Sequence, residues 1–368
     1  MLNPDKSCRK AVSDFVAEQS KQGVDNIASA NTGPYSKARQ RLPEVALKEL
    51  IKVTAESTAK NTHAGWKVYG RELKTFDGTT IRMSDTEANQ ESFPQHSEQK
   101  KGAGFPIVRL LAVMSLTTGV VINYALGAYR GKGTGELSLL REIKESIEID
   151  DIVLGDRAFP CYFVMADLYK MGADGVFRGQ TSRKYDFRKG EKLGKNDHVA
   201  RWKKPQQKPK WMDQSSYDDY PNEIDIREFK VAGTIYVSTF LRAKQYPKKE
   251  LAKLYRLRWH VEINLNSIKT TLNMPMLSCK TPEMIRKEIS IHLLAYNLIR
   301  IMIAEAAQQY ELNPRAVSFK GTLQLLNSFM PYFVNSDPEN NKRMYARMLL
   351  LMAQNSIGNR PGRSNHAE

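Results

Sequence analysis

The apolar positions between residues 248 and 272 recur every three or four residues, a spacing that brings side chains onto one face of an α-helix. Pro247 precedes this segment and no Pro or Gly interrupts it, so the pattern predicts one long helix. The apolar face consists of Leu254, Leu257, Val261, Leu265, Ile268 and Leu272. Polar residues form a second line beside it, within an arc of roughly 60° at about 100° per residue. They are Tyr255, Arg258, Glu262 and Lys269.

These four polar residues allow two interpretations. In the simpler one, Arg258 and Glu262 form a solvated i,i+4 ion pair worth roughly a few tenths of a kcal/mol, as on many charged helix faces. In the other, Glu262 is an acidic metal ligand among groups that bind phosphates. The second interpretation requires partner carboxylates elsewhere in the chain.

From residue 67 the pattern changes to that of β-strands. It predicts strands at 68–78 and 79–85, and two buried strands joined by a hairpin within 107–129. The last segment is long enough to cross a membrane, but its β-branched residues and the turn signal Thr117-Thr118-Gly119 favour the hairpin. Arg109 would also be costly in lipid. We therefore expect no membrane partner.

Two acidic residues follow predicted strands. Asp77 ends the first strand, although Asp77-Gly78 is also a common hairpin turn. Asp156 follows a short apolar strand at 152–154, at the kind of sheet edge where α/β proteins bind ligands, although a helix N-cap explains it as well. Asp85 is a further acidic candidate, more typical of a loop cap.

The predicted order is strand, strand, strand, helix, strand, helix, strand, which resembles a ribonuclease-H-like α/β fold. The Gly-rich stretch 131–135 lacks Walker spacing and is interpreted as a turn before the first of these helices, at 136–147. The fold implies that Asp77 and Asp156 lie together at one end of the sheet, beside the helix that carries Glu262. We expect a helical N-terminal part at 1–66, the core at 67–179, a basic β-rich insertion at 180–247, the core helix at 248–280 and a helical C-terminal part at 281–368.

Charge points to a polyanionic partner. The 368 residues carry a net charge of +16 and a pI near 9.6, typical of proteins that bind nucleic acid. Three cysteines without a CxxC pair indicate a reducing compartment and argue against a zinc site. No secretory signal opens the chain, so we expect work in the cytoplasm.

Basic and aromatic residues gather in two places. In the insertion, Trp202, Lys203 and Lys204 suit stacking on bases and contacts with phosphates, against the simpler interpretation of a solvated loop with core aromatics. Near the start, a short basic helix at 35–42 suits DNA contacts, with a plain helical cap as the equal alternative.

The chain resembles DDE transposases of the insertion-sequence-four family. The family's Y-x2-R-x3-E-x6-K pattern is matched by Tyr255, Arg258, Glu262 and Lys269. Asp77 and Asp156 stand in order before it, within Phe76-Asp77-Gly78-Thr79 and Gly155-Asp156-Arg157-Ala158-Phe159. Segments 32–43 and 194–205 are also similar to family segments, so the resemblance covers about residues 7 to 360.

The resemblance implies roles for these residues. Asp77, Asp156 and Glu262 would form a triad that holds two Mg²⁺ ions, with Mn²⁺ as an alternative. Tyr255, Arg258 and Lys269 would contact DNA phosphates. The implied activity is cleavage at the ends of an insertion element, followed by attack of the released 3′-OH on target DNA. The implied partners are terminal inverted repeats, target DNA and a second copy of the chain in the DNA complex, with a bacterial, nucleoid-associated setting.

Two departures from the family leave other hypotheses open. The chain starts within an apparent early helix, and Asn359 to Arg363 is followed by only five residues, so we expect shortened termini. An inactive relic that binds DNA without cleaving it is one alternative. An unrelated basic nucleic-acid binder, independent of metal, is another.

Overall fold

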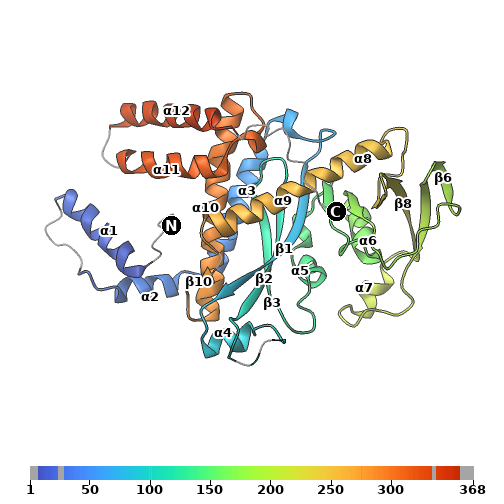
Figure 1. The fold of residues 1–368 in the computed structure, drawn as a ribbon, viewed down its shortest axis with the longest axis horizontal. Coiled ribbons are helices and arrows are strands. Elements are labelled where there is room, and N and C mark those ends of the chain that lie inside the picture. Colours follow the sequence, from blue (N-terminus) through green and yellow to red (C-terminus); the bar gives the residue numbers. More distant parts are fainter. Residues whose placement is uncertain are drawn as a thin grey trace.

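The computed structural model describes residues 7–23, 29–98, 100, 102–274, 276–333 and 337–356. The predictions about both chain ends fall largely outside these residues. The centre of the protein is a β-sheet with strand order β3-β2-β1-β4-β5-β9-β8-β7-β6, and β10 also pairs with β1 (Figure 1). The strands are β1 (Leu73–Met83), β2 (Ile107–Ser115), β3 (Val121–Ala128), β4 (Ile152–Gly155), β5 (Asp174–Arg178), β6 (Glu191–Gly194), β7 (Asp197–Lys203), β8 (Glu223–Val231), β9 (Thr234–Ser238) and β10 (Met276–Leu277).

The first strand does not turn at Asp77-Gly78. β1 continues through both residues, which pair with Ala112 and Leu111 of β2 in regular antiparallel register. The prediction of two strands separated at this point is therefore wrong. Local propensity favours a turn, but pairing with β2 along almost the whole length of β1 outweighs it.

The connections define the fold. β1, β2 and β3 are antiparallel, whereas β4 and β5 run parallel to β1. The helices α5 (Glu136–Glu142) and α6 (Tyr162–Met171) precede β4 and β5, so the order is β1-β2-β3-α5-β4-α6-β5. The predicted ribonuclease-H-like core is confirmed.

Each face of this sheet is buried against different helices. Because side chains alternate along a strand, Leu110 and Ala112 face one layer and Leu111 and Val113 the other. The first layer is the core cluster containing residues of α3 (Glu44–Lys60) and α10 (Pro282–Gln309). The second contains residues of α5 and α6. The core is thus a three-layer arrangement that holds β1 and β4 rigidly at its centre.

The insertion extends the same sheet. β9 pairs with β5, and β8, β7 and β6 follow outward, as the right-hand side of Figure 1 shows. Ala232 and Gly233 both have positive φ, 46° and 83°, which makes the tight hairpin turn between β8 and β9 at the predicted place. A short helix, α7 (Gln214–Asp218), lies between β7 and β8.

Further helices surround the core. α1 (Cys8–Lys21) and α2 (Gly33–Arg41) precede it in the sequence, α4 (Glu87–Ser92) lies between β1 and β2, and α11 (Phe319–Phe333) and α12 (Pro338–Gln354) follow it. α10 is long and apolar enough to cross a membrane, but 67% of its most apolar window is buried inside the protein, as in the core helix of a globular domain. In α2, Arg39 lies against the thiols of Cys8 and Cys279 and is only partly accessible, which leaves Lys37 and Arg41 as its exposed cations.

The predicted long helix is not regular. It consists of α8 (Lys248–Tyr255), a 3-10 turn (Arg256–Arg258), α9 (Trp259–Asn266) and a π-helical turn (Ser267–Thr271). In Figure 1, α9 crosses the sheet at β1, and α8 continues toward β5 and β8. The tight and wide turns change the angles between side chains, so the regular 100° spacing used for prediction does not hold across the whole segment.

Candidate active site

Asp77 and Asp156 lie side by side because their strands are neighbours. β1 and β4 are parallel, and their last paired residues are Thr75 and Leu154. Asp77 and Asp156 each come two residues later, at the carboxyl end of β4. The Thr75 hydroxyl donates to the Leu154 carbonyl at 2.9 Å and joins the two strands just before this point. The sequence-based expectation that these two carboxylates come together is consistent with this register.

Arg258 connects the helix to the sheet. Its guanidinium lies 2.7 Å from Glu262 Oε1 and 3.3 Å from Asp77 Oδ2. The Asp77 side chain is 19% exposed and the Glu262 side chain is 38% exposed. The contact of Arg258 with Asp77 is therefore shielded from solvent, whereas its contact with Glu262 is more open. The simple i,i+4 pair and the tertiary contact with an acidic strand residue are therefore both present.

Burial and neighbouring carboxylates make Asp77 hard to ionise. The pKa of Asp77 is raised to about 6: burial is the largest cause, Asp156 and Glu136 add to it, and Arg258 and the Gly78 amide partly offset it. The Gly78 N–H donates to Asp77 Oδ1 at 2.8 Å. Negative charge is thus concentrated at the centre of the sheet.

Glu136 is a fourth carboxylate in this region, which sequence reasoning read only as the start of a helix. It begins α5, and its side chain lies against Gly78, where a β-carbon would overlap the carboxylate. Its pKa is raised by burial and by Asp156, and lowered by Arg109. In the sequence, the signal for Glu136 as part of the acidic cluster is its position directly after a Gly-rich turn. This signal is weak, because acidic residues are common in the first turn of helices.

The other two residues of the helix pattern lie nearby. Tyr255 is half-buried and packs edge-on against Tyr236. Its pKa is raised, mainly by burial and also by Asp156, while Arg258 partly offsets the shift. Lys269 lies in the π-helical turn, and its ammonium donates to the Thr79 hydroxyl of β1 at 3.2 Å. The helical segment therefore places Arg258 at Asp77 and Lys269 at Thr79 of β1, whereas Tyr255 faces β9.

A divalent cation fits the donor chemistry of this site. Mg²⁺ and Mn²⁺ prefer carboxylate oxygens, and the negative charge of Asp156 contributes to the raised pKa values of Asp77 and Glu136. Among the described residues, no three acidic, His or Cys side chains are grouped closely enough to hold an ion as they stand. Glu262 is instead paired with Arg258. The ligand roles of the triad stay predictions.

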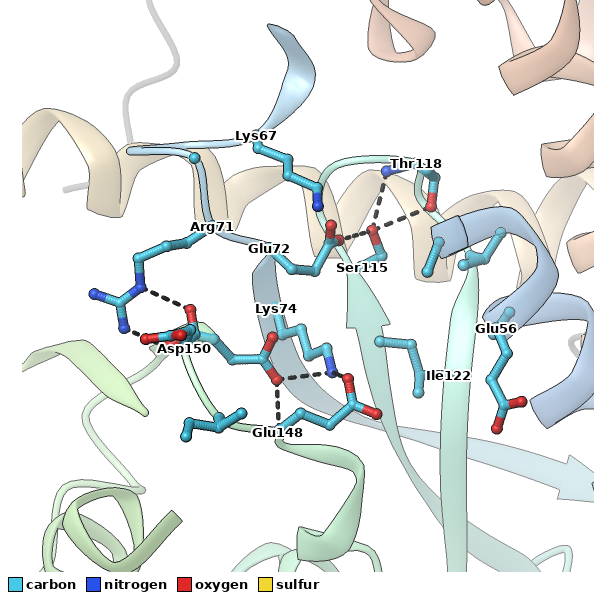
Figure 2. Close-up of a pocket in the computed structure, with 16 residues that line it drawn as sticks. Glu56, Lys67, Arg71, Glu72, Lys74, Ser115, Thr118, Ile122, Glu148 and Asp150 are labelled. Carbon is cyan, nitrogen blue, oxygen red and sulfur yellow. Dashed lines mark hydrogen bonds and ion pairs between the residues drawn. The ribbon is translucent and has the colours of Figure 1, made fainter. Parts of the chain in front are cut away.

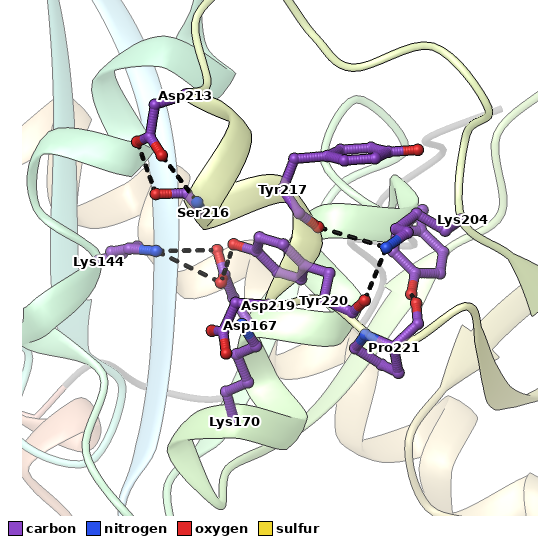
Figure 3. Close-up of polar contacts among 11 residues, drawn as sticks. Lys144, Asp167, Lys170, Lys204, Asp213, Ser216, Tyr217, Asp219, Tyr220 and Pro221 are labelled. Atoms are coloured by element: carbon purple, nitrogen blue, oxygen red, sulfur yellow. Dashed lines mark hydrogen bonds and ion pairs between the residues drawn. The ribbon is translucent and has the colours of Figure 1, made fainter.

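The structure corrects the prediction for Trp202. Its side chain is 1% exposed and donates to Glu228 Oε1 at 2.7 Å, so it is a core residue of the insertion and not a base-stacking platform. Lys203 is 83% exposed and remains a candidate DNA contact. Lys204 donates to the carbonyls of Tyr217 and Tyr220 at 3.3 and 2.8 Å, which gives it a structural role (Figure 3).

A cavity of about 490 Å³ lies at the opposite end of β1, near Glu72 and Lys74 (Figure 2). Lys74 is buried there and pairs with Asp151 at 2.7 Å and Glu148 at 3.4 Å. Arg71 donates to the carbonyls of Asp150 and Asp151. These contacts join β1 to the start of β4. These charged side chains are thus already partnered within the fold, so this cavity is not our candidate site.

Comparison with known proteins gives the family to which this α/β core belongs. The profile of the transposase DDE domain matches residues 69–298, more than half of the chain. The chain therefore belongs to the DDE transposase domain family, and the predicted resemblance is confirmed.

Individual relatives agree with this family. The chain is 27% identical over 279 residues to the Escherichia coli K12 transposase InsG for insertion sequence element IS4, a match that covers 74% of this chain and 61% of InsG. It is 32% identical over 76 residues to the Escherichia coli transposase for insertion sequence element IS421, covering 21% of this chain and 20% of that protein. The chain thus spans less than two thirds of either relative.

Among solved structures, a piggyBac transposase in a synaptic complex with hairpin DNA is similar with a TM-score of 0.44 and 11% identity. That match covers 80% of this chain and 59% of the other. The score is too low to support a conclusion about this chain.

Proposed function

We propose that this chain cleaves DNA at the ends of an insertion element and transfers the resulting 3′-OH into target DNA. The observation that supports this most directly is the register of β1 and β4, which brings Asp77 and Asp156 together beneath the helix that carries Glu262. Membership of the DDE transposase domain family supports the same conclusion.

The residues of the site have two proposed roles, which follow from the chemistry of their side chains. Asp77, Asp156 and Glu262 supply oxygen ligands, and Arg258, Tyr255 and Lys269 supply donors for the phosphates beside the scissile bond. A divalent cation, when bound, activates the attacking oxygen and stabilises the leaving oxygen. Arg258 holds Asp77 and Glu262 in place and offsets part of their repulsion.

The setting we propose is bacterial and cytoplasmic. The +16 net charge favours association with DNA by attraction to phosphates. Element ends and target DNA are the proposed partners, and two copies of the chain act together in the complex with DNA. The mass of a complex with end DNA, measured by light scattering, tests the dimer. Mg²⁺ is the proposed metal, with Mn²⁺ as a substitute.

Cleavage of DNA carrying the inverted repeats that flank the coding sequence tests the activity. We expect nicking in Mg²⁺, none in EDTA, and a loss of at least about 100-fold in Asp156→Asn and Glu262→Gln. Asp85→Asn is the matched control, because Asp85 lies exposed in the loop after β1 and accepts a hydrogen bond from Gln90. Equal nicking by Asp156→Asn and the parent would contradict the proposal. Binding of the end DNA by the parent with no nicking in Mg²⁺ would favour the inactive relic.

A further inference from the structure

A second polar hollow of about 250 Å³ lies beside the acidic cluster, where β4 and β5 end. We call it the arginine pocket. Its lining contains three arginines and no acidic residue. The lining residues are Arg157, Arg178, Gly179, Gln180, Thr181, Arg183, Tyr185, Gly233, Thr234 and Ile235.

The register of β4 and β5 places this pocket next to the site. Gly155 pairs with Phe177, so Asp156 and Arg178 are the next residues on neighbouring strands. Arg157 follows Asp156 directly, and the charge of Arg178 reaches Tyr255 strongly enough to lower its pKa. A strand whose scissile phosphate lies at Asp156 therefore passes close to this pocket.

Two of its cations are available to a ligand. Arg157 and Arg178 are exposed, and neither makes an ion pair with any of the described residues. Arg183 is fixed instead, because it stacks on the Trp202 ring at 3.6 Å and lies 3.5 Å from Glu228 Oε1. The buried Trp202 thus contributes indirectly, by positioning one wall of the pocket.

A buried hydroxyl also points to a missing acceptor. Tyr185 Oη is buried and has no hydrogen bond of ordinary length within the described structure, although the Gln180 backbone is near. It lies over Gly179, where a β-carbon would come within 2.7 Å of it, so only glycine leaves the hydroxyl this room. Burial raises the pKa of Tyr185 to about 12, so the phenol keeps its proton and remains a donor.

We propose that the arginine pocket binds a DNA backbone phosphate next to the scissile one. Guanidinium groups and hydroxyls that donate hydrogen bonds, with no carboxylate among them, match the oxygens of a phosphodiester. This inference rests on the proposed function, because it takes the strand bound at Asp156 to be DNA. The pocket fixes the position of that strand and contributes no base recognition.

Metal-free binding of end DNA tests the pocket separately from cleavage. In EDTA, with a fluorescent duplex carrying one inverted repeat, we expect Arg178→Gln to weaken binding about tenfold and to reduce the slope of log K against log salt by about 1. Tyr185→Phe removes a donor and no charge, so binding weakens a few-fold with the slope unchanged. The control is Arg188→Gln in the same insertion, because Arg188 is 90% exposed, pairs with Asp186 and lies outside the pocket.

Single methylphosphonate substitutions across the duplex identify the phosphate. At one position near the cleavage site, the substitution should weaken binding by the parent and have no further effect on Arg178→Gln, because both changes remove the same contact. Additive effects at every position, or equal losses in Arg178→Gln and Arg188→Gln, would overturn the pocket. A further outcome is that the parent fails to cleave in Mg²⁺ while one methylphosphonate position still has no further effect on Arg178→Gln. In that case the proposed function fails and the phosphate site in the arginine pocket stands.

Discussion

The Glu136 carboxylate lies against Gly78 at a point where any β-carbon would overlap it. Gly78 is part of a regular strand paired with Leu111 and forms no turn, and its missing β-carbon leaves the space that the Glu136 carboxylate occupies. The consequence is a third carboxylate beside Asp77 and Asp156 that belongs to α5. We therefore expect Glu136 to contribute to the cation binding that we propose for Asp77, Asp156 and Glu262.

Gly78→Ala and Glu136→Gln are expected to have the same effect on metal binding. Both should weaken Mn²⁺ binding roughly tenfold, because one displaces the carboxylate and the other removes its charge. The double variant should bind no more weakly than either single variant, since both act on one interaction. Electron paramagnetic resonance of free Mn²⁺ measures the affinity without any DNA.

Gly135→Ala is the control for the glycine substitution. Gly135 immediately precedes α5, and a β-carbon there meets nothing within 4 Å. We expect its metal affinity to match that of the parent. If Gly78→Ala also binds Mn²⁺ like the parent, the close approach does not position Glu136 for the metal.

In the absence of metal, the free energy of unfolding should depend on pH because of Asp77. Its pKa is raised from 3.8 to about 6, so the folded state holds a proton that the unfolded state has lost between about pH 4 and pH 6. Stability of the parent therefore falls as pH rises through this window. In EDTA at pH 7 we expect Asp77→Asn to be more stable than the parent by about 1–3 kcal/mol, with little difference at pH 4.

Urea unfolding in EDTA at several pH values measures this difference. Asp85→Asn, at an exposed loop carboxylate, serves as the control and should change neither stability nor its pH dependence. An Asp77→Asn protein less stable than the parent at pH 7 would show that the contact with Arg258 outweighs the cost of burying the charge.

Trp202→Phe is expected to affect stability and not DNA contact directly. The indole donates to the buried Glu228, and its loss leaves that carboxylate short of one donor, at a cost of about 1–3 kcal/mol. Thermal unfolding measures the cost. Trp211→Phe is the control at an exposed indole and should cost less. A DNA affinity lowered about tenfold with unchanged stability would instead restore the original prediction for Trp202.

Local patterns predicted much of this fold because they act over a few residues. The hairpin at Ala232-Gly233, the strand before Asp156 and most helices follow from short-range propensity and periodicity. The continuity of β1 through Gly78 depends on pairing with a strand about thirty residues away, so local turn chemistry misled the prediction.

The site was predictable only in part for similar reasons. Glu262 and Arg258 share a helix and can be read from spacing, whereas the contact of Arg258 with Asp77 spans 181 positions of sequence. Glu136 enters the cluster from a helix that only the folded chain brings near. Trp202 was misjudged because an aromatic residue next to two lysines looks the same in sequence whether it is buried or exposed.

Arg258 contacts two of the carboxylates that we propose as metal ligands. It bridges Asp77 and Glu262, so a cation binding to these groups must share or displace its guanidinium. We expect Arg258→Gln to tighten Mn²⁺ binding a few-fold, because the guanidinium no longer occupies the carboxylates. The same substitution should weaken DNA binding about tenfold, because a positive charge that attracts the phosphates is lost. A purely structural role for Arg258 would lower both affinities together.

Arg256→Gln separates this effect from a general loss of charge. Arg256 lies in the same 3-10 turn, two residues before Arg258, and is exposed. The same substitution there should leave Mn²⁺ affinity unchanged, since Arg256 makes no ion pair with the described carboxylates of the site. If Arg258→Gln binds Mn²⁺ more weakly than the parent, the bridge organises the carboxylates for the metal instead of competing with it, and Arg258 must stay in contact with them when the ion binds.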